Sequence, residues 1–167
     1  MGLSKTPPII IDIEASGFGP ESYPIEVGLV LASGQTYCAL IQPLPEWNHW
    51  DSSAEVVHRV PRDVLELYGQ PVIKVAQDIN ELLKDQQAYS DGWVVDNSWL
   101  STLFYAAKIQ QKFRFSMLDL ILLEEQMEHW HSTKDSVIRE FDLKRHRASL
   151  DAIIIQKTYE RTRPHKV

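Results

Sequence analysis

The feature that most constrains this chain is an apolar run that ends in two acids. Residues 9–11 are three consecutive isoleucines, and Asp12-Ile13-Glu14 follows directly. A β-branched run of this kind is typical of a buried central strand. Residues two apart in a strand point to the same face, so Asp12 and Glu14 are expected to project together. Their mutual repulsion leaves two interpretations, a strand that emerges into solvent or a pair of ligands for a shared divalent cation.

The remaining periodicity predicts a mixed α/β domain. Residues 25–31 and 37–41 flank a short turn and are expected to form an antiparallel hairpin beside the first strand. Apolar side chains at helical spacing predict two amphipathic helices over residues 52–68 and 71–84. The later segments are expected to be a strand at 88–90, a helix from near Asp96, a strand at 113–117 and a helix from 148 to about 161. This order predicts a three-stranded meander continued into a mixed sheet with helices on its faces.

Size and charge limit the possible functions. The 167 residues suit a single domain, taken here as residues 1–167, and 44% hydrophobic residues exclude a disordered tail. A net charge of −6 argues against a protein that coats nucleic acid through bulk positive charge. The charge is uneven, with 8 basic and 18 acidic side chains in residues 1–133 and 9 basic and 5 acidic ones in residues 134–167. The C-terminal fifth is therefore a local basic region.

The sequence also bears on the cellular setting. Cys38 is the single cysteine, so no internal disulfide is expected. No apolar run approaches the roughly 20 residues of a membrane span, and no signal-peptide pattern is present. We therefore expect a cytoplasmic protein that does not interact with membranes.

A third acid, Asp96, falls at the start of an expected helix after an expected strand. In isolation, an Asp in a first helical turn is commonly just a helix stabiliser, because its charge complements the helix dipole. Asp91 lies five residues earlier and is a second candidate acid in this segment.

The basic C-terminal region contains a histidine and a fourth acid. His146 and Asp151 are five residues apart, so they cannot share one helical face. We therefore expect His146 in the loop before the last helix and Asp151 in its first turns. Lys144, Arg145 and Arg147 surround the histidine, and taken alone this cluster is typical of a solvated basic loop.

Together these residues resemble the DEDDh (DnaQ-like) family of 3′-to-5′ exonucleases, which has the ribonuclease H-like fold. The resemblance rests on Asp12-Ile13-Glu14 before a small-residue turn with Gly17, on Asp96-Asn97-Ser98-Trp99-Leu100, and on His146-Arg147-Ala148-Ser149-Leu150-Asp151. It implies a mixed five-stranded sheet. Family members often carry Asn, commonly preceded by His, where this chain has Asp91-Gly92-Trp93-Val94-Val95. Asp91 is thus a candidate substitute ligand, and Asp96 is preferred because the aromatic-Leu pair follows it.

The resemblance implies a site with two metal ions. In it, Asp12, Glu14, Asp96 and Asp151 hold two Mg²⁺ or Mn²⁺ ions, which relieve the repulsion among the carboxylates. His146 is the general base that takes a proton from the attacking water. The implied product is a 5′-phosphorylated mononucleotide.

The resemblance also implies contacts with the 3′ end of single-stranded DNA or RNA. The turn Ala15-Ser16-Gly17-Phe18 would contact the terminal nucleotide through its backbone, with Phe18 wedged against the last base. Phe18 is equally well explained as a local loop anchor. His58 falls where relatives carry a histidine near the substrate groove, and a partly buried structural histidine is the alternative. The oligomeric state is open, with a homodimer as one option.

Two other functions fit the same residues. A phosphodiesterase acting on small nucleotides would keep the same site. A non-catalytic nucleic-acid-binding module of the same fold would have lost ligands, and here all five expected residues are present. Since a single domain without an accessory domain is expected, we also expect short or single-stranded substrates.

Overall fold

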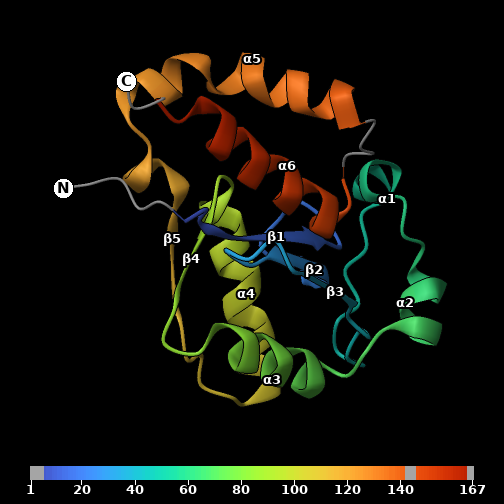
Figure 1. Cartoon of the computed structure of the whole chain (residues 1–167). Helices are drawn as coiled ribbons and strands as arrows, with labels where there is room; N and C mark the ends of the chain where they lie inside the picture. Colours follow the sequence, from blue (N-terminus) through green and yellow to red (C-terminus); the bar gives the residue numbers. More distant parts are fainter. Residues whose placement is uncertain (1–5, 142–145, 165–167) are drawn as a thin grey trace.

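The computed structural model describes residues 6–141 and 146–164, and a five-stranded sheet lies at its centre. Figure 1 shows how the helices are arranged around this sheet. The strands are β1 (Ile9–Ala15), β2 (Pro24–Val30), β3 (Thr36–Leu40), β4 (Gln87–Ser90) and β5 (Arg114–Met117). Their order in the sheet is β3-β2-β1-β4-β5. β1, β2 and β3 pair antiparallel, whereas β4 lies parallel to β1 and β5 parallel to β4. The predicted mixed sheet is confirmed.

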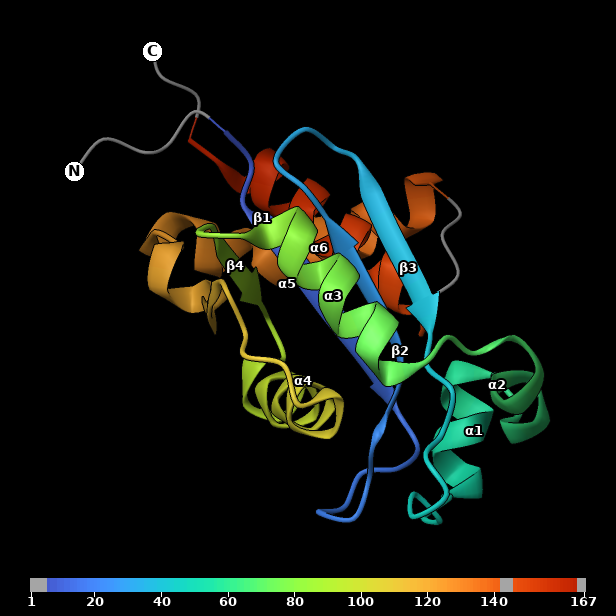
Figure 2. The same cartoon turned by 90° about the horizontal axis from the view of Figure 1, so that it is seen from below.

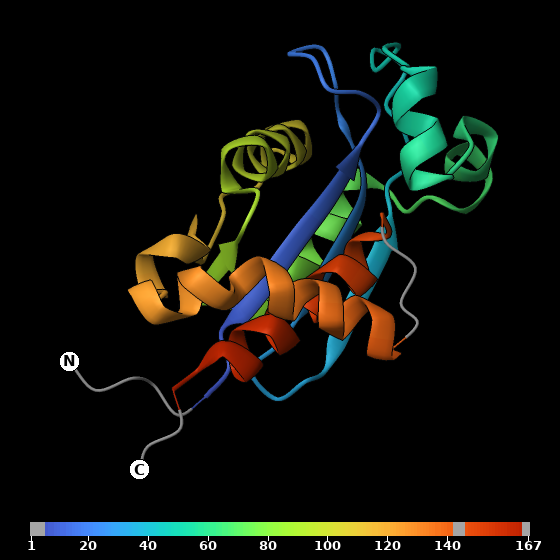
Figure 3. The ribbon, with the colours of Figure 1, turned by 90° about the horizontal axis from the view of Figure 1, so that it is seen from above.

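Helices cover both faces of this sheet. The helices are α1 (Ser52–His58), α2 (Arg62–Tyr68), α3 (Val72–Leu83), α4 (Trp93–Ala107), the 3₁₀ turn η1 (Leu118–Ile121), α5 (Glu124–Phe141) and α6 (Ala148–Thr162). Figure 2 shows α3 and α4 on one face, and Figure 3 shows α5 and α6 on the other. None of the helices in the described part of the chain combines the length and apolarity needed to cross a bilayer.

The two faces of β1 pack against different helices. Ile9, Ile11 and Ile13 belong to the large core that includes side chains of α3 and α4. Ile10 belongs to a second core with side chains of α6. Alternation along a strand then places Asp12 and Glu14 on the face of Ile10, toward α6. The strand's end therefore presents its two acids to the N-terminal end of the last helix.

Two predicted boundaries differ from the structure. The single helix expected over residues 52–68 is two short helices, α1 and α2, separated at residues 59–61. Arg59 adopts the left-handed conformation (φ 59°), and Pro61 precedes α2 and lacks the amide hydrogen that a continuing helix needs. Helix α4 begins at Trp93, before the expected start, so Asp96 lies within its first turn.

Candidate active site

One pocket of about 200 Å³ brings the expected acids and histidine together. Its lining includes all five of them: Asp12, Glu14, Asp96, His146 and Asp151. They come from β1, the first turn of α4, the loop before α6 and the first turn of α6. Segments that are distant in sequence therefore converge at the end of β1.

Burial and mutual repulsion make the carboxylates of β1 weak acids. Burial raises the pKa of Asp12 well above its usual range, and the nearby carboxylates, first of all that of Asp96, raise it further. Burial likewise raises the pKa of Glu14 to about 8, with Asp151 and Glu26 adding to the effect. The protein alone therefore does not stabilise the ionised forms of these two groups.

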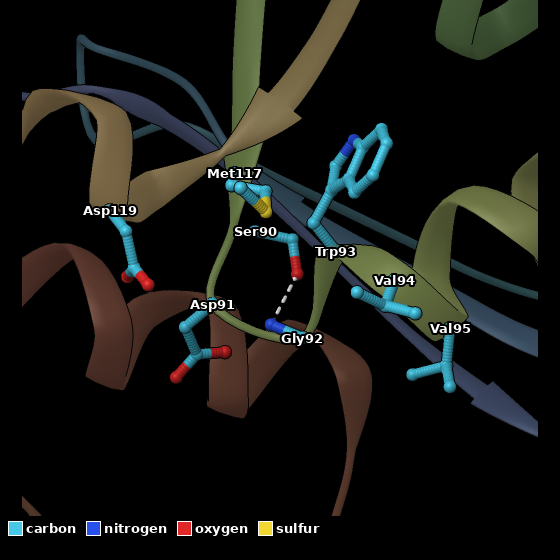
Figure 4. Close-up of a pocket in the computed structure, with 8 residues that line it drawn as sticks. All are labelled: Ser90, Asp91, Gly92, Trp93, Val94, Val95, Met117 and Asp119. Carbon is cyan, nitrogen blue, oxygen red and sulfur yellow. Dashed lines mark hydrogen bonds between the residues drawn. The ribbon is translucent and has the colours of Figure 1, made fainter.

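Asp96 is fixed in the pocket by local hydrogen bonds. It is only 3% exposed, and the Ser90 hydroxyl, at the end of β4, donates to its Oδ2. The Ser90 oxygen in turn accepts from the Gly92 amide at 2.9 Å, as Figure 4 shows. Burial raises the pKa of Asp96 to about 7, although the Ser90 hydrogen bond acts in the opposite direction. The β4–α4 loop thus orients this carboxylate.

His146 and Asp151 occupy the loop and first turn expected from their spacing. The His146 backbone is left-handed (φ 66°), and its amide donates to Asp151 Oδ2 at 2.7 Å. One possible ligand atom from each of Glu14, His146 and Asp151 lies within 4.8 Å of the others. This group is compact enough to hold one metal ion.

An ion pair with a buried carboxylate anchors the segment that carries these groups. Glu26 of β2 is fully buried, and its carboxylate accepts hydrogen bonds from Arg147 Nε and a terminal guanidinium nitrogen at 3.0 and 2.7 Å. The same carboxylate accepts from the Ala148 amide at 3.1 Å. Sequence reasoning missed Glu26, and the available signal was a single acid inside an apolar strand.

The start of α6 lies directly against the sheet at a glycine. A Cβ on Gly28 would lie 2.1 Å from the backbone nitrogen of Ser149. This distance is too short for any residue with a side chain, so only glycine fits at this position. Gly28 pairs with Asp12 across the β1–β2 ladder. The glycine therefore lets the first turn of α6 approach β1 where its acids emerge.

Asp91 and Lys134 also line the pocket. Lys134 of α5 forms an ion pair with Asp91 in the β4–α4 loop, with 2.6 Å between Nζ and Oδ2. Asp91 also borders a neighbouring pocket of about 300 Å³ between this loop and η1 (Figure 4). In the view of Figure 4, Asp91 and Asp119 lie on one side of the loop, and Val94 and Val95 lie on the other side. Sequence reasoning did not identify Lys134.

The expected substrate turn is mostly buried. Ala15, Ser16 and Gly17 are buried, whereas Phe18 is 67% exposed. The Ser16 amide donates to the Tyr23 carbonyl at 2.9 Å, so it is already paired. None of the four residues of this turn, 15–18, is among the described residues that line the carboxylate pocket.

His58 lies in the interior and is not among the described residues that line the carboxylate pocket. It is 2% exposed, its Nδ1 accepts from the Val60 amide at 3.1 Å, and its ring meets Trp50 edge-on. Burial lowers the pKa of His58, which favours the neutral ring. The other expected basic residues, Lys144 and Arg145, lie outside the described residues.

Among comparisons with known proteins, only those with solved structures find similar proteins. The sequence matches no family model and no curated protein. Among solved structures, E. coli Exonuclease I in complex with a dA16 oligonucleotide aligns with a TM-score of 0.67 at 11% identity, over 92% of this chain and 40% of that one. The zinc-bound E. coli exonuclease I complex with single-stranded DNA aligns with a TM-score of 0.66 at 12% identity, over 94% and 40%.

These alignments identify the architecture. The chain has the ribonuclease H-like α/β fold that the family resemblance implied. It spans about two fifths of the length of the exonuclease I chains that it matches. At these identities the likeness establishes the fold alone, and the chemistry of the site depends on this chain's own residues.

Proposed function

We propose that this chain is a divalent-metal-dependent 3′-to-5′ exonuclease that releases 5′-mononucleotides from single-stranded or short nucleic acid. The observation that carries the proposal is the convergence of the four expected carboxylates and His146 in a single pocket. The shared fold adds support, because exonuclease I is a nuclease solved with single-stranded DNA.

The donor set suits two Mg²⁺ or Mn²⁺ ions. Both ions prefer oxygen ligands, which Asp12, Glu14, Asp96 and Asp151 would supply. The raised pKa values of the first three show that their ionised forms lack sufficient compensation within the protein. Bound divalent ions would neutralise the carboxylates and polarise the phosphodiester.

The chain's own residues would position and deprotonate the attacking water. His146 lies beside Glu14 and Asp151, so a ring nitrogen can take the proton of a water in the pocket. The hydrogen bond from the His146 amide to Asp151 fixes the backbone that carries this ring. Phe18 is exposed at the neighbouring turn, where it would pack against the last base.

The test is digestion of RNA and DNA oligonucleotides labelled at either end, with Mg²⁺ or Mn²⁺. A 3′ label should leave at once as a mononucleotide, and a 5′ label should give a descending ladder. EDTA and the Asp12→Asn variant should abolish both. Cleavage of a circular single strand as fast as a linear one would contradict the exonuclease assignment.

The same assay separates the two alternative functions. A dinucleotide hydrolysed much faster than a 20-mer would favour a phosphodiesterase acting on small nucleotides. Metal-dependent binding of the 20-mer without any hydrolysis would favour the non-catalytic module.

A further inference from the structure

Lys134 occupies an unusual place for a lysine. On α5 the buried side chains are Gln126, Trp130 and Val137, which form one face of the helix. Lys134 follows Trp130 by four residues and precedes Val137 by three, so it lies along this same face. Its side chain is only 18% exposed. A charged group in such a position is costly unless it is paired.

The ammonium of Lys134 reaches the carboxylate pocket. Its partner there is Asp91, which is itself only 25% exposed. Among the described residues that line the pocket, Lys134 is the only lysine or arginine. It therefore supplies an ammonium group to a lining that contains five carboxyl groups.

Stability alone does not account for the pair. Removing two charges from water costs about as much as their attraction returns, so such a pair adds little to folding. An apolar side chain at residue 134 would continue the buried face of α5. The position of the ammonium therefore points to a ligand that carries negative charge.

We propose that Lys134 is a substrate-binding residue that contacts a non-bridging phosphate oxygen of the nucleic-acid strand. This inference rests on the proposed function. A lysine suits the role because it is a compact charge with three donors on a flexible stem. Asp91 holds the ammonium at the pocket before substrate arrives, and this pairing gives Asp91 a role other than metal binding.

The experiment measures binding and turnover separately. Fluorescence anisotropy with a labelled single-stranded 12-mer, with Ca²⁺ in place of Mg²⁺, gives the affinity at several salt concentrations. Lys134→Gln should weaken binding about tenfold and make the slope of log K against log salt shallower by about 0.7, which corresponds to one phosphate contact. In the Mg²⁺ assay its KM should rise more than its kcat falls. Lys134→Arg should retain most of the affinity and the wild-type slope.

A matched control is available on α3. Lys74 also pairs with an aspartate, Asp78, but its side chain is 56% exposed and it does not line the pocket. Lys74→Gln should leave the affinity, the slope and KM unchanged. Thermal melting of each variant shows whether it is folded.

Asp91→Asn separates the proposed role of Asp91 from metal binding. It should leave Mn²⁺ affinity, measured by calorimetry, unchanged. A large loss of Mn²⁺ affinity would make Asp91 a ligand and contradict its role as the partner of Lys134.

The outcomes separate the two proposals. A folded Lys134→Gln variant with wild-type affinity, slope and KM would overturn the role of Lys134 and leave the exonuclease assignment standing. Wild-type protein that binds the 12-mer through Lys134 but hydrolyses nothing would overturn the exonuclease assignment alone. Wild-type protein that neither binds nor hydrolyses would overturn both.

Discussion

Glu26 and Arg147 form an ion pair although 121 positions of sequence separate them. The carboxylate of Glu26 is buried, and it accepts hydrogen bonds from the guanidinium just before α6. Arg147 directly follows His146. The Glu26–Arg147 ion pair therefore fixes the position of the backbone next to His146. Glu26→Gln keeps the shape of the side chain but removes the charge that compensates Arg147. We expect it to lower the free energy of unfolding by about 2 kcal/mol, measured by urea denaturation, because the charged hydrogen bonds at the buried end of the pair are weakened. We also expect kcat to fall while the fold is retained.

An exposed pair provides the control for this change. Glu140 also binds an arginine, Arg161, through two hydrogen bonds, but the Glu140 side chain is 55% exposed. Glu140→Gln should lower the free energy of unfolding far less than Glu26→Gln does, because solvent screens an exposed ion pair. Equal losses in the two variants would show that burial of Glu26 is not what makes its pair important.

The contact between Gly28 and α6 predicts a second stability effect. Gly28→Ala would force its Cβ against the Ser149 backbone, and because backbone cannot swing aside, α6 would have to shift. We expect a loss of about 3 kcal/mol or more in the free energy of unfolding, together with loss of activity. Gly19→Ala is the matched control, because nothing lies within 4 Å of a Cβ at that position. A Gly28→Ala variant as stable as Gly19→Ala would contradict this close packing.

The raised pKa values predict how stability depends on pH when no divalent ion is bound. The pKa of Glu14 rises from its ordinary 4.5 to about 8, and that of Asp96 from 3.8 to about 7. Between about pH 5 and 8 the folded protein therefore binds more protons than the unfolded chain, so its stability falls as the pH rises. The melting temperature in EDTA should drop over this range.

Two comparisons test the cause of this pH dependence. Glu14→Gln should reduce it, because one of the three carboxyl groups with a raised pKa is gone. Millimolar Mg²⁺ or Mn²⁺ at pH 8 should raise the melting temperature of the wild type, since the ions bind the native state. A melting temperature in EDTA that increases from pH 5 to 8 would contradict the raised pKa values.

The sequence predicts those parts of the site that follow from local periodicity. Strand alternation alone places Asp12 and Glu14 on one face, and five-residue spacing separates His146 from the helix of Asp151. The antiparallel meander of β1, β2 and β3 also follows from the sequence. The division of residues 52–68 was also open to prediction, because Pro61 stands in the middle of that segment.

The partners of these residues depend on the tertiary fold. Lys134 and Asp91 form an ion pair although 43 positions of sequence separate them. Nothing in the sequence around either residue indicates that the other is its partner. The burial of Ser16 and Gly17 likewise depends on a later loop: the Asp51 amide donates to the Ser16 carbonyl, and His49 packs over Gly17. Sequence patterns specify which face a residue occupies, but they do not specify which distant segment covers it.

The last prediction concerns His146, for which the geometry allows two roles. Its ring is close enough to Glu14 and Asp151 to share a metal ion with them, and also close enough to accept a proton from water in the same pocket. If it is the general base, its removal should lower kcat by about 10²–10⁴ and leave Mn²⁺ affinity and oligonucleotide Kd nearly unchanged. His146→Asn is the better variant, because asparagine tolerates the left-handed backbone at this position more readily than alanine.

Asp151→Asn supplies the reference for metal loss. It should remove the rise in melting temperature caused by Mn²⁺ and reduce Mn²⁺ affinity in calorimetry, because it removes one of the expected ligands. His146→Ala should show the same kinetic loss as His146→Asn, with some added destabilisation from its backbone preference. If His146→Asn loses as much Mn²⁺ affinity as Asp151→Asn, His146 is a metal ligand and its assignment as general base is wrong. Wild-type kcat in His146→Asn would exclude both roles, because neither a ligand nor a base can be removed without slowing the reaction.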